Sequence, residues 1–170
     1  RNNVRGDRTA SVKHSWPGLS GWLDKAVVEA GLIEWYNTRV ASGVPANSYM
    51  LASPKWDGLS IVITYSPDGV PLEALTRGEG GMGVDVTHIF RADKRHFRSR
   101  VMDTNFGIKY ECVMRWADVE QMSEDLGKDY KNPRNTVAGI IGSDDGASRR
   151  CYITLVPLDI EWNSCNLDRY

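Results

Sequence analysis

Lys55, Asp57 and Gly58 form a K-x-D-G motif directly in front of a segment that alternates like a strand. A lysine amine attacks an electrophile only when it is uncharged, and burial or nearby cations lower its pKa toward that state. The position beside a buried strand predicts that Lys55 is buried. Asp57 would orient the amine or help to hold a metal ion, and Gly58 would let the backbone approach closely. The motif alone also fits a plain solvated turn.

The elements around this motif predict an antiparallel sheet. Residues 59–65 alternate apolar and polar, residues 66–69 (SPDG) suit a turn, and residues 70–77 suit the returning strand. Further strands are expected at 49–52, 109–114 and 151–162, and helices at 23–40 with a break at Gly31, at 117–127 and at 132–142. Strands joined by tight turns, with helices between the groups, indicate an α+β fold.

Gly78, Gly80 and Gly83 spell G-x-G-x-x-G, but the next residues, VDVTHI, are β-branched and suggest extended chain. A dinucleotide-binding fold needs a helix at that point, so a tight loop is the better interpretation. The three histidines, His14, His88 and His96, are scattered and are expected to be packed or surface residues rather than metal ligands.

Length and composition suit one globular domain, or one domain with appendages, without strong charge bias. The chain has 170 residues and a formal net charge of −1, so no global basic field points to nucleic acid, although a local basic face is allowed. No apolar run approaches the roughly 20 residues that span a bilayer, and no signal-peptide pattern is present. The three cysteines form no C-x-x-C pair, which favours a reducing compartment.

Several segments occur in one order: HSWPGLSGWLDKA, SPKWDGLSIVITY, LTRGEGGMGVDVT, KYECVM, KNPRNTVAGII and RRCYITLVPL. Together, over about residues 13–162, they resemble the adenylation domain of bacterial-type NAD-dependent DNA ligases. The T-R-G-x-G-x-x-G-x-D-V-T and N-P-R-N matches are specific. The bare K-x-D-G is shared with ATP-dependent ligases and capping enzymes, so agreement across several motifs carries the resemblance.

The resemblance implies an incomplete antiparallel-sheet nucleotidyltransferase (ATP-grasp-like) domain over residues 13–170, behind a loose segment at 1–12. It also implies a role for each matching residue. Lys55 would become adenylylated, with Asp57 beside it; Arg77 would lie near the nucleotide; Glu111 would hold the ribose hydroxyls; Ser20 and Gly21 would line the nucleotide pocket; and Arg134 would face the phosphates or the nicked DNA. The resemblance assigns no metal ligands, although Mg²⁺ is the metal expected.

The implied activity is that of a DNA ligase that uses NAD to seal nicks in duplex DNA during replication and repair. The implied location is the cytoplasm of a bacterial cell, with a bacterial or phage gene and no membrane partner. Two alternatives remain open: an ATP- or GTP-using nucleotidyltransferase of the RNA ligase or capping type, and a catalytically impaired relative that binds nucleotide or DNA.

The chain departs from the family pattern at several charged positions. Ser53 stands for a glutamate, Val84 for a carboxylate, Lys109 and Tyr110 for the R-G of R-G-E, and Gly142 for an arginine. The family's later D-G-V-V-x-K-V strand and its other domains have no counterpart. These gaps predict either a piece of a longer ligase or one polypeptide of a split enzyme whose second chain carries the remaining motifs.

Overall fold

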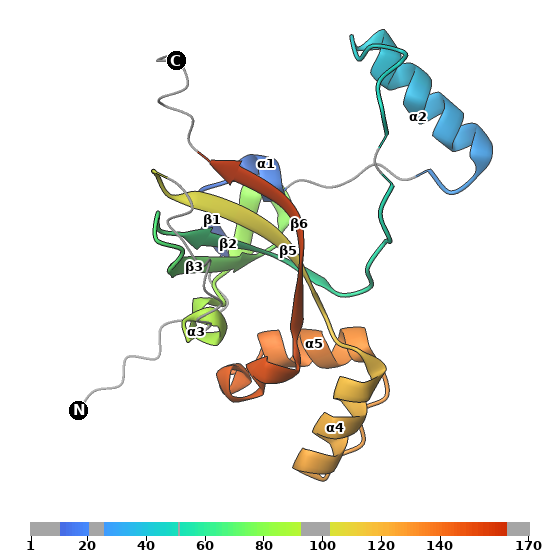
Figure 1. Ribbon diagram of the computed structural model, residues 1–170. Coiled ribbons are helices and arrows are strands. Elements are labelled where there is room, and N and C mark those ends of the chain that lie inside the picture. The colour runs from blue at the N-terminus through green and yellow to red at the C-terminus, as the bar shows by residue number, and fades with distance from the viewer. Residues whose placement is uncertain (1–10, 21–25, 51, 93–102, 163–170) are drawn as a thin grey trace. The chain divides into compact units, whose positions relative to one another are not determined.

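The computed structural model describes residues 11–20, 26–50, 52–92 and 103–162 (Figure 1). The chain divides into two compact units, one formed by residues 1–21 with 56–170 and the other by residues 22–55. The larger unit contains a four-stranded antiparallel sheet in the order β3 (Pro71–Thr76), β2 (Leu59–Tyr65), β5 (Phe106–Val113) and β6 (Thr154–Trp162). The predicted α+β class with antiparallel pairing is confirmed.

The hairpin predicted at residues 59–77 forms as expected. The β2 and β3 strands pair antiparallel, with Ile61 opposite Thr76. In the turn between them, Gly69 has a φ of +80°, and its N–H donates to the carbonyl of Ser66 at 2.9 Å. Glycine takes that backbone conformation without the steric penalty that other residues incur. The turn chemistry therefore sets the register of the first two strands.

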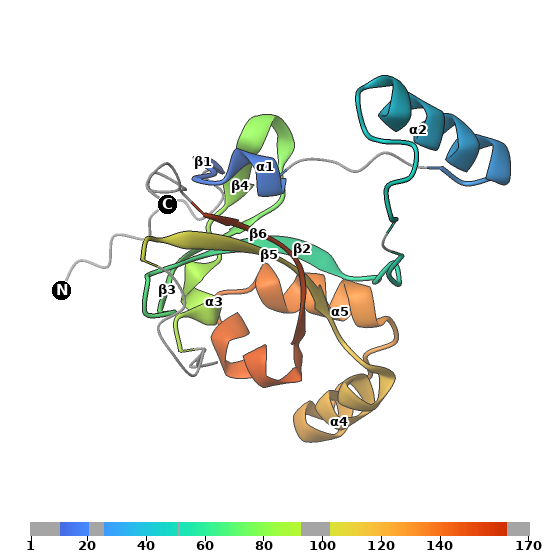
Figure 2. The same cartoon turned by 45° about the horizontal axis from the view of Figure 1, so that its top comes forward.

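The main core lies on one face of this sheet. Apolar side chains of β2 and β5 meet α3 (Thr87–Phe90), α4 (Trp116–Leu126), α5 (Pro133–Ile141) and the 3₁₀ segment η2 (Gly146–Tyr152). Both ribbon views place α3 and α5 on the same side of the sheet (Figures 1 and 2). The fully buried members of the core include Ile61, Ile63, Ile89, Phe90, Phe106, Cys112, Val119, Met122, Val137, Ile140 and Ile153. Burial of this apolar surface is the main force that holds the helices against the strands.

The opposite face of the sheet carries a smaller cover. The short helix α1 (Pro17–Ser20) places Trp16 and Leu19 against Val62 of β2. The Trp16 indole N–H donates to the hydroxyl of Thr64 at 3.0 Å. A Cβ on Gly107 would lie 2.5 Å from the Trp16 ring, so the small residue in β5 makes room for the indole. Both ribbon views place α1 across the sheet from α3 and α5 (Figures 1 and 2).

A second, two-stranded sheet joins β1 (Ser11–Lys13) to β4 (Met82–Val84), which follows the 3₁₀ turn η1 (Glu79–Gly81). Ser11 and Val12 therefore form a strand rather than part of a loose segment, because β4 offers them a pairing partner. Residues 1–10 lie outside the described part of the chain.

The two later helices begin and end where the sequence predicts. The α4 helix stops at Gly127, which is left-handed with a φ of +60°. The α5 helix starts after Asn132, whose side-chain oxygen accepts the N–H of Asn135 at 2.9 Å, and Pro133 occupies the first turn. An asparagine cap followed by proline is a strong helix start. This start places Arg134 in the first turn of α5.

Three expectations about secondary structure are wrong. Tyr49, Met50 and Ala52 form no strand, since no described segment pairs with them. The Gly31 break is absent, because a glycine costs a helix only about 1 kcal/mol and α2 (Glu29–Ala41) runs through it. Residues 87–90 are helical rather than extended; the Asp85 carboxylate accepts the N–H of Thr87 at 2.8 Å and starts that turn.

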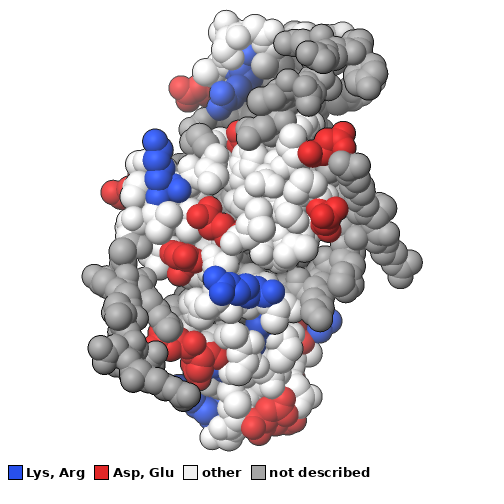
Figure 3. Space-filling view, turned by 90° about the vertical axis from the view of Figure 1, so that its left-hand side faces the viewer, with Lys and Arg blue, Asp and Glu red and all other residues white. Residues whose placement is uncertain are grey.

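The smaller unit, residues 22–55, has little core of its own among its described residues. The α2 helix has no buried residue, and Leu32 and Ile33 are each about half exposed. None of the described helices has the length and apolar character that crossing a bilayer requires. On the face drawn in Figure 3, basic and acidic side chains are interspersed, in keeping with the net charge of −1.

Candidate active site

The sheet register brings Arg77 and Glu111 to one face. Glu111 of β5 stands opposite Ser60 of β2, and the N–H of Arg77 donates to the carbonyl of Ser60 at 3.1 Å. Residues directly opposite one another in an antiparallel sheet project to the same side. Val62, two residues beyond Ser60, packs against Trp16 and Leu19, so this is the face that α1 covers.

Lys109 belongs to the same face, because it lies two residues before Glu111 on β5 and opposite Val62. Its other neighbour across the sheet is Asp159 of β6. The residue is only 7% exposed. Burial lowers the pKa of Lys109, the Arg77 guanidinium lowers it further, and the carboxylates of Asp159 and Glu111 oppose that shift.

The sequence interpretation treated Lys109 as a departure from R-G-E and missed it as a site residue. The signal that could have found it was its spacing. Two residues before Glu111 on a strand is the nearest position on the same face.

Asp57 and Arg134 meet although 77 positions separate them in the chain. The Arg134 Nη1 atom donates to the Asp57 Oδ1 atom at 2.8 Å, and both side chains are largely exposed. The hydrogen bond and charge of Asp57 raise the pKa of Arg134 above its usual value, and the Glu111 carboxylate adds to the rise. The Glu111 carboxylate therefore acts electrostatically on Arg134 as well. The partner of Arg134, Asp57, lies just before β2.

Gly58 makes the close approach that the motif predicts, and it makes it to β5. A Cβ at position 58 would lie 2.0 Å from the carbonyl oxygen of Cys112 and 2.9 Å from the Val113 side chain. Only glycine fits this contact without a shift of the backbone. The contact anchors the K-x-D-G segment to the strand that carries Glu111.

Lys55 is exposed, so the expectation of burial is wrong. The segment from Ala52 to Asp57 is exposed and irregular, and β2 begins only at Leu59. Lys55 is the last residue of the smaller unit. Chain connectivity alone keeps its Cα within about 7.6 Å of the Cα of Asp57, at about 3.8 Å per residue.

Ser20 is the last residue of α1, the helix on the face shared by Arg77 and Glu111. Its side chain and all of Gly21 lie outside the described residues, so their predicted role in a nucleotide pocket stays a prediction. Of the substituted positions, Ser53 is exposed, Val84 ends β4, and Gly142 caps the C-terminus of α5.

His14 is a packed residue, as expected, and is only 4% exposed. Its Nε2 atom lies 3.0 Å from the carbonyl oxygen of Thr76, the residue before Arg77. His88 contacts the carbonyl of Ser143 at 3.2 Å, and His96 lies outside the described residues. Within the described part of the chain, no three His, Cys, Asp or Glu side chains gather as a metal site would require.

The glycine cluster forms a tight loop, as predicted. Gly80 and Gly81 have φ values of +61° and +74°, and a Cβ on Gly78 would lie 2.1 Å from the carbonyl oxygen of Met82. The following strand, β4, pairs antiparallel with β1. The described sheets contain no parallel β-α-β unit, so the rejection of a dinucleotide-binding fold is confirmed.

Comparison with known proteins gives a family match. Residues 7–158 match the family described as NAD-dependent DNA ligase adenylation domain. The chain is 36% identical over 132 residues to a DNA ligase of Borrelia turicatae, which covers 76% of this chain and 19% of that protein. It is 37% identical over 136 residues to a DNA ligase of Alkalilimnicola ehrlichii, and this match covers 75% of this chain and 20% of that protein. It is 32% identical over 165 residues to a DNA ligase of Roseiflexus castenholzii, and this match covers 85% of this chain and 23% of that protein.

The chain belongs to the NAD-dependent DNA ligase adenylation domain family, as the resemblance of its motifs indicated. It spans about a fifth of the length of the DNA ligases to which it is similar.

Proposed function

We propose that this chain is the adenylating part of an NAD-dependent DNA ligase with the nucleotidyltransferase (ATP-grasp-like) fold. The observation that carries the proposal is the family match over residues 7–158 together with the geometry of the larger unit. That geometry places Arg77, Lys109 and Glu111 on one sheet face, with the Asp57–Arg134 pair at the start of β2.

In the proposed first step, the uncharged amine of Lys55 attacks the adenylyl phosphorus of NAD. A nitrogen–phosphorus bond forms as the bridging phosphorus–oxygen bond breaks. Nicotinamide mononucleotide leaves with the electron pair, and the amine gives up its proton. AMP stays on Lys55 as a phosphoramide. Lys55 is exposed, so its amine is accessible to a substrate that arrives from solvent.

The residues of the sheet face would hold the adenylate. The Glu111 carboxylate accepts hydrogen bonds from the paired ribose hydroxyls, and the Arg77 guanidinium donates to phosphate oxygens. Lys109, which is buried on the same face two residues before Glu111, would add positive charge that helps to bind an anionic substrate.

Mg²⁺ fits the donors available here, since it is commonly held by one or two carboxylates together with substrate phosphates. Asp57 is the exposed carboxylate within the K-x-D-G motif and would hold the ion. The bound ion would neutralise charge that develops on the phosphate oxygens. Arg134 would then exchange Asp57 for a phosphate of the nucleotide or the DNA.

In the later steps, AMP passes from Lys55 to the 5′-phosphate of a nick, and the 3′-hydroxyl displaces it to seal the strand. Nicked duplex DNA is therefore the proposed second substrate. Sealing would also use the other parts of the ligase, in this polypeptide or in a second one.

The test is incubation of the chain with NAD labelled in its adenylate group, followed by detection of a covalent adduct on a denaturing gel. The wild-type chain should become labelled from NAD and not from ATP. Lys55→Ala should lose at least about 99% of the label, because a missing nucleophile removes the reaction. Lys13→Ala, which changes another exposed lysine, should keep it.

Label on the Lys55→Ala variant would overturn the nucleophile assignment. Label from ATP alone would favour the ATP-using alternative. A folded wild-type chain that takes label from neither nucleotide would favour the catalytically impaired relative.

A further inference from the structure

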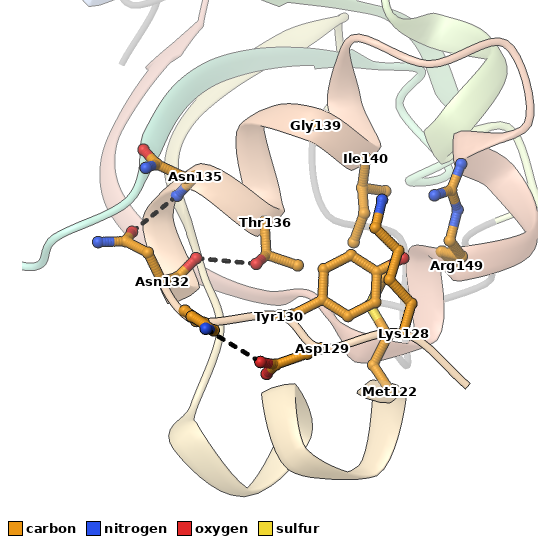
Figure 4. A pocket seen from close by; sticks show the side chains of 11 residues that line it. Met122, Lys128, Asp129, Tyr130, Asn132, Asn135, Thr136, Gly139, Ile140 and Arg149 are labelled. Carbon is orange, nitrogen blue, oxygen red and sulfur yellow. Dashed lines mark hydrogen bonds and ion pairs between the residues drawn. The ribbon is translucent and has the colours of Figure 1, made fainter. Parts of the chain in front are cut away.

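A pocket of about 470 Å³ lies beside α5 in the larger unit (Figure 4). Its lining comes from α4, from the loop that follows it, from α5 and from η2. Asn132 and Asn135 stand at one end of the view, Arg149 at the other, and Tyr130 with Lys128 between them (Figure 4). None of these residues belongs to the sheet face that carries Glu111.

The charge of this lining is predominantly positive. Lys128, Lys131 and Arg149 line the pocket together with one carboxylate, Asp129. The Lys131 ammonium lies 3.2 Å from the Asp129 carboxylate. The Lys128 ammonium lies 5.2 Å from the centroid of the Tyr130 ring, a contact that leaves its charge unneutralised. Lys131 and Arg149 each have a carboxylate partner, so the excess positive charge of this lining is that of Lys128.

One nitrogen donor of Arg149 lacks a hydrogen-bond acceptor among the described residues. One of its terminal nitrogens, Nη2, donates to the hydroxyl of Ser143 at 3.0 Å and also pairs with Asp145. Its Nε atom is buried and has no hydrogen-bond acceptor among the described residues. Leaving a buried donor unpaired is costly. An anion bound in the pocket is a natural partner for the cations that line it.

The polar end of the pocket adds to the preference for an anion. Asn132 and Asn135 flank the first turn of α5, a helix of nine residues whose N-terminus carries partial positive charge. The same turn contains Arg134, which is paired with Asp57. The pocket therefore borders the candidate active site through the start of α5.

We propose that this pocket binds the sugar-phosphate backbone of duplex DNA beside the nick, through Lys128, Lys131 and Arg149. The proposal rests on the proposed function, which supplies DNA as the substrate. A duplex backbone places phosphates at regular intervals, and lysine and arginine contacts to them give affinity without regard to sequence. A surface that continues from Arg134 into a basic pocket suits such a chain of phosphates.

The test compares two variants with equal loss of charge. Lys128→Gln with Lys131→Gln removes two pocket cations, and Lys13→Gln with Arg91→Gln removes two exposed cations elsewhere. Binding of a fluorescent nicked duplex is measured over a range of salt concentrations. The pocket variant should bind about tenfold more weakly and lower the slope of log affinity against log salt by about 1 to 2. The control variant should keep the wild-type affinity and slope.

Labelling of Lys55 from NAD, measured in the same samples, separates this proposal from the proposed function. The pocket variant should take label at the wild-type rate. Equal DNA binding by the two variants would overturn the DNA proposal, as would a wild-type chain with no measurable DNA binding. A pocket variant that binds DNA normally but loses labelling would also overturn it and would indicate a nucleotide site. Failure of the wild-type chain to take label would count against the proposed function without altering the DNA comparison.

Discussion

The ion pair between Asp57 and Arg134 illustrates how an exposed contact can matter to chemistry more than to stability. Both side chains are largely open to water, and exposed ion pairs typically contribute about 0–1 kcal/mol. Its significance is positional. It links the first turn of α5 to Asp57, the residue of the K-x-D-G motif that lies two positions after Lys55 in the chain.

Arg134→Ala should therefore leave the free energy of unfolding within about 1 kcal/mol of wild type. Transfer of AMP from the adenylylated chain to nicked DNA should fall tenfold to a hundredfold, roughly the loss expected for charge-assisted bonds to phosphate. Urea unfolding and single-turnover transfer measure the two effects. Arg115→Ala is the control, because Arg115 forms an exposed ion pair with Asp118 outside the site at 2.7 Å. Equal loss of transfer in both variants would contradict the role of Arg134.

Gly58 is the residue whose replacement should damage the fold most directly. In Gly58→Ala, the new methyl group would meet the Cys112 carbonyl at 2.0 Å, so β2 and β5 must separate locally. We expect a loss of about 1–3 kcal/mol in the free energy of unfolding, the usual cost of overpacking.

Gly139→Ala provides the matched control for this substitution. A Cβ at position 139 meets no other atom within 4 Å. Because the position is inside α5, alanine should stabilise the chain by about 0.5–1 kcal/mol. Urea unfolding of both variants decides the matter. A Gly58→Ala chain as stable as wild type would show that the contact with β5 is dispensable.

At the level of elements, β5 is the strand that organises the site. It is central in the sheet, it carries Glu111 and Lys109 on one face, and its other face contributes Phe106, Ile108 and Tyr110 to the core. One strand thus couples the stability of the core to the placement of charge. Lys109 shows the cost of this arrangement, because a buried ammonium disfavours its own charged form.

This cost predicts a pH dependence. Below the lowered pKa of folded Lys109, the residue is protonated in both states and the burial penalty is fully present. Between that pKa and the unfolded value of about 10.4, the unfolded chain binds the extra proton, so the free energy of unfolding rises with pH. Wild type should therefore gain stability relative to Lys109→Met as the pH is raised from neutral toward 10. Urea unfolding at several pH values measures this difference, and a difference that stays constant with pH would contradict it.

At the level of the whole molecule, the two units differ in how much they bury. Within the larger unit, β5 is buried along nearly its whole length. In the smaller unit, α2 has thirteen residues and none of them is buried. Helices of this length are marginal in water without tertiary packing. The two units should therefore differ in local stability.

Amide hydrogen exchange should reveal that difference. Amides in α2 should exchange at least about a hundredfold faster than those of β5, because local opening of an unpacked helix needs little free energy. Mass spectrometry of peptic fragments after timed exchange gives both rates in one experiment. Equal protection of α2 and β5 would mean that the smaller unit is held by packing that the exposed surface of α2 does not show.

The sequence by itself was enough for several local elements and for the family. The β2–β3 hairpin depends on alternation and on the SPDG turn, and the ends of α4 and α5 depend on Gly127 and Asn132. These signals act within a few residues, so they can be read without a fold. The order of several motifs was equally legible and indicated the family that comparison then established.

The tertiary structure decided which residues meet. The register of β2 with β5 put Lys109 beside Glu111 on the α1 face, and helix packing brought Arg134 to Asp57. It also left Lys55 exposed and gave Ser11 a partner strand in β4. These outcomes arise from pairing and burial between segments far apart in the chain. Local pattern carries no information about that partner choice, because the free energy of such contacts depends on the whole assembled core.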